Sequence, residues 1–391
     1  LWSRGLGDVY KRQRQSSCIG ASVGNYVPSS GASSQTQCEP GTYQPMYGQT
    51  SCVQASQGNY VPSSGASTQT PASMGYYVPS NGSSSQTACP AGTYQNSTGQ
   101  ASCINADAGY YVPSNASSSQ IPCAPGTYQP SSGTTSCLDA AAGYFVYSYP
   151  STSQTPCAPG TYQPSTGQSS CLDASPGHYV DTSGATVQSP CTPGSFQSAP
   201  GQTSCIQATL GNYVDIYAAV DQIAASPGHY VNSTGATSQD ACSVGTYQPN
   251  MAQTTCLDSD AGHYVNVIGS ASQTECYYGT YQPSTGQSSC IDASAGYHVP
   301  STAAINQTAC SIGTYQPSTG QSSCIGTSPG HYVNTIASTS QTPCDIGSFQ
   351  PLYMQDRCNP ADPGYHVPNT GSANQTACNP GTFNVPGLHA V

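Results

Sequence analysis

Positive charge is almost missing from this chain of 391 residues. Lys and Arg together number 5 against 16 Asp and Glu, and charged residues make up only 5% of the sequence. Nucleic-acid binding is excluded because almost no cations are present to neutralise phosphates. Binding to an anionic membrane surface is excluded for the same reason, and no lysine-containing phosphate loop occurs.

Long apolar runs and helical periodicity are missing too. No run of 18 apolar residues marks a membrane-spanning helix. No stretch repeats its apolar residues with a helical period, so we expect almost no helix. Ser, Thr, Gly, Pro, Gln and Asn dominate, a composition that can indicate disorder. The 20 cysteines in fixed register, with an aromatic residue in every repeat, argue for an ordered chain instead.

A glycine recurs at every seventeenth position from Gly24 to Gly381, and no slot of this register lacks it. The stretch from Cys157 to Cys171, CAPGTYQPSTGQSSC, shows the unit Cys-x2-Gly-x-Tyr-x8-Cys. We call each slot a half-repeat and count positions from its glycine, so that position +2 is the second residue after it. One such unit is too small to bury a core alone. We therefore expect a stack in which each Tyr packs on the Tyr of its neighbour.

Two kinds of half-repeat alternate. The short-loop kind has its cysteine at position +11, and nine of its ten slots have Gln at position +3, with Asn384 in the last. The long-loop kind has a cysteine slot at position +14, and all twelve have Val at position +3, from Val27 to Val367. Position +2 is Tyr in 16 slots, Phe in four and His in two, His298 and His366.

The fold class follows from these local patterns. A glycine two residues before an aromatic predicts a positive φ or a close backbone approach, and Pro-Ser-Thr-Gly predicts a turn. We expect an all-β or irregular fold of small disulfide-rich repeats, in a linear, solenoid-like rod of 17-residue half-repeats and 34-residue full repeats. Two geometries stay open. Parallel β coils at about 4.8 Å each would span roughly 105 Å, and a beaded chain would be longer.

The cysteine spacing indicates which cysteines pair. Spacings alternate between 14 and 20, but 37 replaces 20 after Cys52 and after Cys205. At both places two long-loop half-repeats follow each other, with Ala72 and Ala225 in the cysteine slot, and both members of a 14-spaced pair are missing. This loss favours disulfides across the shorter spacing, each closing a loop of about 15 residues and contributing roughly 3 kcal/mol. The predicted pairs are Cys38–Cys52, Cys89–Cys103, Cys123–Cys137, Cys157–Cys171, Cys191–Cys205, Cys242–Cys256, Cys276–Cys290, Cys310–Cys324 and Cys344–Cys358.

The cysteine motif resembles the cysteine-rich module of TNF-receptor-like and ephrin-receptor-like repeats, in which its first and last cysteines pair. The resemblance extends from Cys18 to Cys378 and implies a slender rod of short β segments. This chain departs from those receptors because the intervening half-repeat has no cysteine pair and is sometimes doubled. Their ligand binding is not carried over, since it belongs to loops that vary, and these loops hardly vary.

Both ends of the sequence stand apart from the array. Residues 3–13, SRGLGDVYKRQ, resemble a translated sequencing adapter, so we expect residues 1–13 to be a non-native segment. Residues 14–391 then form a continuous array of about 22 half-repeats. We expect this array to be truncated at both ends, because Cys18 and Cys378 lack partners in register.

Catalytic and metal sites are not expected. The motif GASVG, Gly20 to Gly24, matches a nucleophile pattern but lies in a repeat turn, so we expect neither an enzyme nor a cofactor. Four histidines share position +1 but lie at least two half-repeats apart, and four aspartates share a register without a calcium loop. These residues are His178, His229, His263, His331, Asp139, Asp173, Asp258 and Asp292.

Glycosylation has more support. Six Asn-x-Ser/Thr sequons lie in predicted turns, where covalent glycans would shield exposed backbone edges from aggregation. They begin at Asn81, Asn96, Asn115, Asn232, Asn306 and Asn374.

The sequence favours an extracellular structural protein that forms a fibre, stalk or surface appendage. Its expected partner is itself, in a head-to-tail or lateral polymer, with no nucleic acid and no direct membrane insertion. The alternative is a repeat spacer in the ectodomain of a cell-surface receptor or adhesin.

Overall fold

The computed structural model describes residues 17–383. The predicted non-native segment 1–13 and Asn384 lie outside the described residues. The described chain contains 42 strands of two residues each and no helix, which confirms the all-β repeat fold. No helix within residues 17–383 has the length and apolar character needed to cross a membrane. Two compact units divide near residues 190–204, and both are built from the same hairpin.

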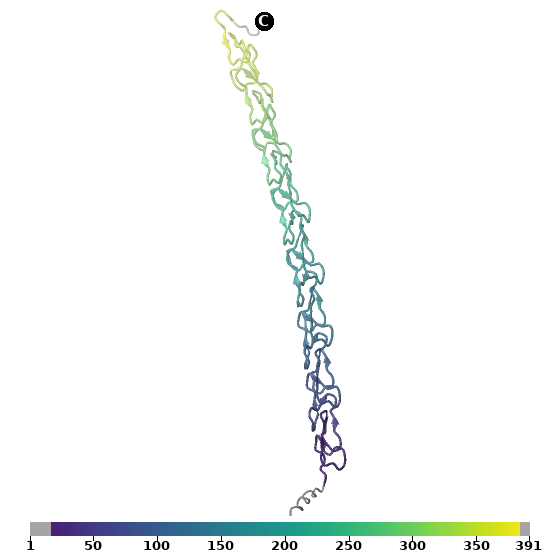
Figure 1. The fold of residues 1–391 in the computed structure, drawn as a ribbon. Helices are drawn as coiled ribbons and strands as arrows, with labels where there is room; N and C mark the ends of the chain where they lie inside the picture. Colours follow the sequence, from purple (N-terminus) through teal and green to yellow (C-terminus); the bar gives the residue numbers. More distant parts are fainter. Residues whose placement is uncertain (1–16, 384–391) are drawn as a thin grey trace, which may run out of the picture. The chain divides into compact units, whose positions relative to one another are not determined.

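Each half-repeat forms one antiparallel hairpin. Positions +1 and +2 make the first strand, positions +12 and +13 make the second, and +2 pairs with +12. In the half-repeat of Gly160, β17 (Thr161–Tyr162) pairs with β18 (Leu172–Asp173) in this register. Figure 1 traces the hairpins in chain order, from purple through teal to yellow.

The strands pair in sequence, β1 with β2 through β41 with β42, as 21 two-stranded sheets. The first strands are β1 Asn25–Tyr26, β3 Thr42–Tyr43, β5 Asn59–Tyr60, β7 Tyr76–Tyr77, β9 Thr93–Tyr94, β11 Tyr110–Tyr111, β13 Thr127–Tyr128, β15 Tyr144–Phe145, β17 Thr161–Tyr162, β19 His178–Tyr179, β21 Ser195–Phe196, β23 Asn212–Tyr213, β25 His229–Tyr230, β27 Thr246–Tyr247, β29 His263–Tyr264, β31 Thr280–Tyr281, β33 Tyr297–His298, β35 Thr314–Tyr315, β37 His331–Tyr332, β39 Ser348–Phe349 and β41 Tyr365–His366. The second strands are β2 Thr36–Gln37, β4 Val53–Gln54, β6 Thr70–Pro71, β8 Thr87–Ala88, β10 Ile104–Asn105, β12 Ile121–Pro122, β14 Leu138–Asp139, β16 Thr155–Pro156, β18 Leu172–Asp173, β20 Ser189–Pro190, β22 Ile206–Gln207, β24 Ile223–Ala224, β26 Asp240–Ala241, β28 Leu257–Asp258, β30 Thr274–Glu275, β32 Ile291–Asp292, β34 Thr308–Ala309, β36 Ile325–Gly326, β38 Thr342–Pro343, β40 Asn359–Pro360 and β42 Thr376–Ala377.

The two kinds of half-repeat have the same strand register. Tyr230 pairs with Asp240 in a long-loop half-repeat, and Tyr247 pairs with Leu257 in the short-loop half-repeat that follows. Despite their names, the two kinds therefore do not differ in loop length, because the cysteine at +14 of a long-loop half-repeat is position −3 of the next half-repeat. Since the strands pair antiparallel inside each half-repeat, the described residues do not adopt the parallel-coil geometry.

A tight turn leads into each first strand. In the half-repeat of Gly160, the N–H of Thr161 donates to the carbonyl of Ala158 at 3.0 Å, with Pro159 and Gly160 between them. Gly160 has φ +89°. A type II turn requires positive φ at its third residue, which Gly160 supplies, and proline is common at its second residue.

Backbone hydrogen bonds join each half-repeat to the next. The N–H of Gly58 donates to the carbonyl of Val78 at 2.9 Å, and the N–H of Val61 donates to the carbonyl of Ser83 at 3.1 Å. A third bond runs in the other direction. The N–H at +7 of the following half-repeat donates to the carbonyl at −3 of the half-repeat before it, at 2.8 Å in this pair. Two-residue strands are thus held by neighbours as well as by their own hairpin.

The repeat glycine also contacts the half-repeat two places ahead. A Cβ on Gly126 would lie only 2.2 Å from the carbonyl oxygen of Gly167, which is position +7 of that half-repeat. For 17 repeat glycines between Gly24 and Gly330 the same carbonyl lies 2.0–2.5 Å from a would-be Cβ. The sequence predicted a positive φ or a close approach, and both are present.

The buried column consists of positions +3 and −3. Eleven of the long-loop valines at +3 are 0–3% exposed and the nine glutamines of the short-loop kind are 1–6% exposed. Position −3 is a buried Ala or Cys in most described half-repeats, with Ser259 and Thr327 as fully buried exceptions. The predicted core of stacked tyrosines is wrong, because the residue at +2 is only half-buried in most described half-repeats and the buried positions are +3 and −3. The ring contact found, Phe145 with Tyr147, joins positions +2 and +4 of one half-repeat.

We predict that Gly126→Ala destabilises its hairpin more than Gly133→Ala does. Both glycines have positive φ, +89° and +71°, which costs alanine about 1–2 kcal/mol. A Cβ on Gly133 meets its nearest atom at an ordinary 3.6 Å, whereas at Gly126 backbone must also move, which adds roughly 1–3 kcal/mol. Local opening free energies from amide hydrogen exchange measure the difference. Equal losses at the two sites would contradict the close-approach explanation.

Candidate functional site: two alternating hairpin closures

Nine disulfides close the short-loop half-repeats. Each joins position −3 to position +11, with Cα atoms 5.7–5.8 Å apart and a sequence separation of 14. They join the cysteines that the sequence-based pairing joined: Cys38–Cys52, Cys89–Cys103, Cys123–Cys137, Cys157–Cys171, Cys191–Cys205, Cys242–Cys256, Cys276–Cys290, Cys310–Cys324 and Cys344–Cys358. Cys18 and Cys378 are the free cysteines of the described chain.

A glutamine closes the long-loop half-repeats at the same place. All twelve have Gln at +11, and its Oε1 accepts the backbone N–H of position −2 at 2.7–2.8 Å. In the half-repeat of Gly177, Gln188 accepts from Ser175 in this way. Sequence reasoning missed this closure, although Gln occupies the slot in every long-loop unit. These residues are Gln35, Gln69, Gln86, Gln120, Gln154, Gln188, Gln222, Gln239, Gln273, Gln307, Gln341 and Gln375.

The side-chain amide of the buried glutamine at +3 makes two hydrogen bonds within the short-loop half-repeat. Gln163 Nε2 donates to the carbonyl of Ser170 at 2.9 Å, and its Oε1 accepts the N–H of Ser165 at 3.1 Å. The same two bonds recur in half-repeats from Gln44 to Gln350. No buried side-chain nitrogen or oxygen within residues 17–383 lacks a partner. A polar residue is therefore compatible with this core position because its amide is satisfied.

The histidines at position +1 are held within their own half-repeats. In each of the four, Nδ1 lies 3.3 Å from the carbonyl oxygen at position −1, as for His178 and Pro176. The aspartates at +13 lie singly against the glycine at +7 two half-repeats ahead, as Asp139 does against Gly167. Within the described chain, neither the histidines nor the aspartates are brought together as a metal site.

One cluster of possible ligand atoms does occur. His298 Nδ1 and the sulfurs of Cys310 and Cys324 all lie within 4.8 Å of one another. The two sulfurs are bonded to each other, so neither is a thiolate available to a metal ion. His298 Nδ1 lies 3.1 Å from Cys324 Sγ.

The ion pair found within residues 17–383 is local and exposed. Arg357 Nη2 lies 3.0 Å from Asp356 Oδ2. The hydrogen bond from the Arg357 guanidinium is the main cause that lowers the pKa of Asp356, and the same bond raises the pKa of Arg357. Because both side chains are open to solvent, the pair defines no binding site.

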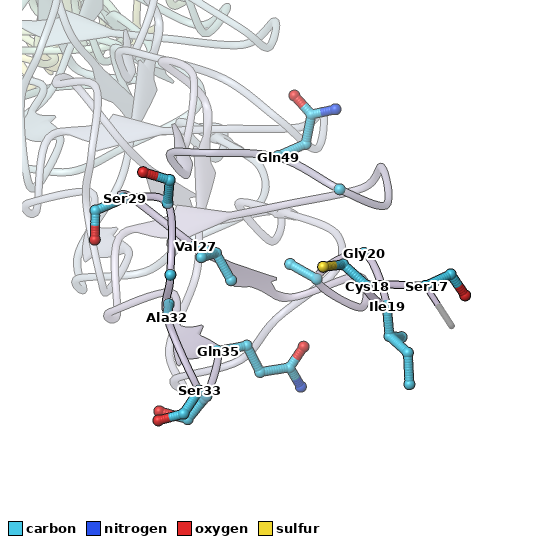
Figure 2. A pocket seen from close by; sticks show the side chains of 15 residues that line it. Ser17, Cys18, Ile19, Gly20, Val27, Ser29, Ala32, Ser33, Gln35 and Gln49 are labelled. Atoms are coloured by element: carbon cyan, nitrogen blue, oxygen red, sulfur yellow. The ribbon is translucent and has the colours of Figure 1, made fainter. Parts of the chain in front are cut away.

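A hollow of about 1120 Å³ lies at the first described hairpin. Val27 at +3, Gly31 at +7 and Ala32 at +8 line it. In later half-repeats these three positions make the backbone hydrogen bonds to the preceding half-repeat. Figure 2 shows Val27 and Ala32 around the hollow together with Cys18.

The six sequon asparagines are all exposed. Asn81 and Asn115 occupy position +6, and in both the Oδ1 atom accepts a backbone N–H from the preceding half-repeat at 2.9 Å. These contacts use the amide oxygen, whereas an N-linked glycan is carried by Nδ2.

Comparison with known proteins assigns no family. No family model matches this chain, and no curated protein matches it either.

We predict that Ala55→Cys with Gln69→Cys forms a tenth disulfide. The two residues hold positions −3 and +11 of a long-loop half-repeat whose strand register equals that of the disulfide-closed kind. A new loop of this length contributes about 3 kcal/mol, offset by about 1 kcal/mol for the lost hydrogen bond from Ser56 to Gln69. Non-reduced peptide mapping detects the bond, and hydrogen exchange in β5 and β6 measures the gain. Gln69→Cys alone is the control, and a double variant with two free thiols would contradict the shared geometry.

Proposed function

We propose that this protein is an extracellular structural protein, a disulfide-stapled array that builds a fibre, stalk or surface appendage rather than an enzyme. The observation that carries this proposal is the identity of the contacts from one half-repeat to the next. The same backbone bonds recur whether the hairpin is closed by a disulfide or by glutamine.

The doubled half-repeats support this argument. After Cys52, two long-loop half-repeats follow each other, and Gly58 and Val61 still bond to Val78 and Ser83 in the usual register. Stacking therefore depends on the common backbone and not on strict alternation. Each further unit would change the folding free energy of such an array by a nearly constant amount, because each unit contacts only its near neighbours.

Head-to-tail association with copies of itself is part of this proposal. Each half-repeat uses the same backbone groups to contact the half-repeat before it and the one after it. A contact between two copies could therefore repeat a contact that already occurs inside the chain.

An extracellular location is favoured by the nine disulfides, because disulfides persist in oxidising compartments. A spacer in the ectodomain of a receptor or adhesin would use the same architecture. In that case the array would lie between a cell surface and a binding domain. Its likeness to TNF-receptor-like repeats would then include this placement as well as the cysteine motif.

We predict continuous filaments built from this array when native material is imaged by electron cryomicroscopy without reducing agent. The filaments should show a repeat that corresponds to one half-repeat of 17 residues, since both kinds of half-repeat make the same backbone contacts with their neighbours. Reduction before imaging should break them into less regular material, because the staples replace a large hydrophobic core. Discrete particles that each end in a unique globular domain would contradict the fibre and favour the receptor spacer.

We also propose that the surface carries N-linked glycans at some of the exposed sequons, among them Asn81 and Asn115. Treatment with an N-glycosidase should lower the mass of native material and convert each occupied Asn to Asp. The variants Ser83→Ala and Ser117→Ala, which remove these two sequons, should each remove one glycan. An unchanged mass after enzyme treatment would contradict the proposal.

A further inference from the structure

One disulfide differs from the other eight in the residue beside it. The residue at +2 of each long-loop half-repeat precedes the +11 cysteine of the next short-loop half-repeat by 26 positions. For eight of the nine disulfides this residue is Tyr or Phe, as Tyr264 is for Cys290. For Cys310–Cys324 it is His298, whose Nδ1 lies 3.1 Å from Cys324 Sγ.

We propose that Cys310–Cys324 is the site of thiol–disulfide exchange in this array, and that His298 makes it so. The co-reactant is a small thiol or dithiol. A disulfide whose reduced form is stabilised is more readily reduced, and a neighbouring imidazole stabilises a cysteine thiolate. Tyr and Phe carry no such charge-accepting ring nitrogen.

Burial decides the order of the reaction steps. Cys310 is fully buried, whereas Cys324 is half-buried. The incoming thiolate therefore attacks Cys324 Sγ, the Sγ–Sγ bond breaks, and its electron pair leaves on Cys310 Sγ. A second thiolate attacks the small-molecule sulfur of the mixed disulfide and forms an external disulfide. The bond between that sulfur and Cys324 Sγ breaks, and the electron pair of this bond leaves on Cys324 Sγ, which accepts a hydrogen bond from His298 Nδ1–H.

His298 lies close to both sulfurs that acquire charge. Nδ1 and the two sulfur atoms lie within 4.8 Å of one another, so the same imidazole favours both steps. The ring is half-buried beside the sulfurs, where a hydrogen bond to a charged acceptor is stronger than in open solvent.

The opening of this pair would leave the neighbouring hairpins closed. The adjacent half-repeats have their own closures, through Gln307 on one side and Gln341 on the other. Thiol exchange at this one position would thus loosen a single hairpin, β35 (Thr314–Tyr315) with β36 (Ile325–Gly326). It would also add a sulfur able to form a mixed disulfide, at Cys324, to the free thiols of Cys18 and Cys378.

The experiment titrates all nine disulfides at once. The full chain, with Cys18→Ser and Cys378→Ser to prevent exchange with the free thiols, is equilibrated in a series of glutathione redox buffers. Free thiols are then trapped by alkylation, and chymotrypsin cleaves after the tyrosines. Cleavage after Tyr315 separates Cys310 from Cys324, and cleavage after Tyr281 separates Cys276 from Cys290.

We expect Cys310–Cys324 to have the largest reduced fraction, with an equilibrium constant for reduction roughly tenfold above the median of the other eight. His298→Tyr should bring it into their range. This variant places Tyr after Tyr297, as Tyr77 follows Tyr76 in the native chain. The matched gain-of-function variant, Tyr264→His, should raise the reduced fraction of Cys276–Cys290 severalfold.

Three results would overturn the proposal. The first is that Cys310–Cys324 is reduced together with the other eight disulfides. The second is that it is reduced before them in the wild type and in His298→Tyr alike. In the latter case the cause would be local looseness and not the imidazole. Failure of Tyr264→His to raise reduction of Cys276–Cys290 would also refute the role of the ring nitrogen.

Discussion

The contact that the rest of the structure depends on is the close approach of the repeat glycine to the carbonyl oxygen at position +7 two half-repeats ahead. At 2.0–2.5 Å from a would-be Cβ, that carbonyl leaves no space for any side chain. One inserted or deleted residue would move position +7 out of this contact for two or three successive glycines. This steric demand explains the spacing of the 17 glycines between Gly24 and Gly330 that make the contact, whereas a Cβ on Gly109 would instead meet Pro150 Cβ at 3.0 Å.

The chain combines this strict spacing with a small core because position −3 is always small. Ala and Cys fill it in most half-repeats with 0–5% exposure, and neither changes the distance between hairpins. The hairpin can then be closed covalently, by Cys at −3 and +11, or by the amide of Gln at +11. Closure and stacking are therefore separate tasks, which is why two long-loop half-repeats can follow each other without disturbing the array.

The sequence predicted those features that one half-repeat carries by itself. The glycine at the turn of Gly160 predicted a positive φ, and the missing pair near Ala72 predicted which cysteines bond. It did not predict which positions form the buried column. A Tyr that recurs in every repeat is expected in the core unless the directions of the side chains at +2 and +3 are known. The contact between Gly126 and Gly167 was also beyond reach, because their separation is not a multiple of the repeat length and needs the three-dimensional stack.

Local exceptions show that side chains adapt in pairs across this stack. Position +7 has positive φ in the described half-repeats except that of Gly143, where it is Pro150. It is Gly or Ala in most half-repeats, but it is Met354, with φ +60°, in one. The Cγ of Met354 lies 2.5 Å from a would-be Cβ at Gly326, which is position +13 two half-repeats before. Gly326 is the one glycine at +13 in the described chain. The large residue at +7 is thus accommodated by the absence of a side chain at +13 two half-repeats earlier, so these two facing positions are matched in size.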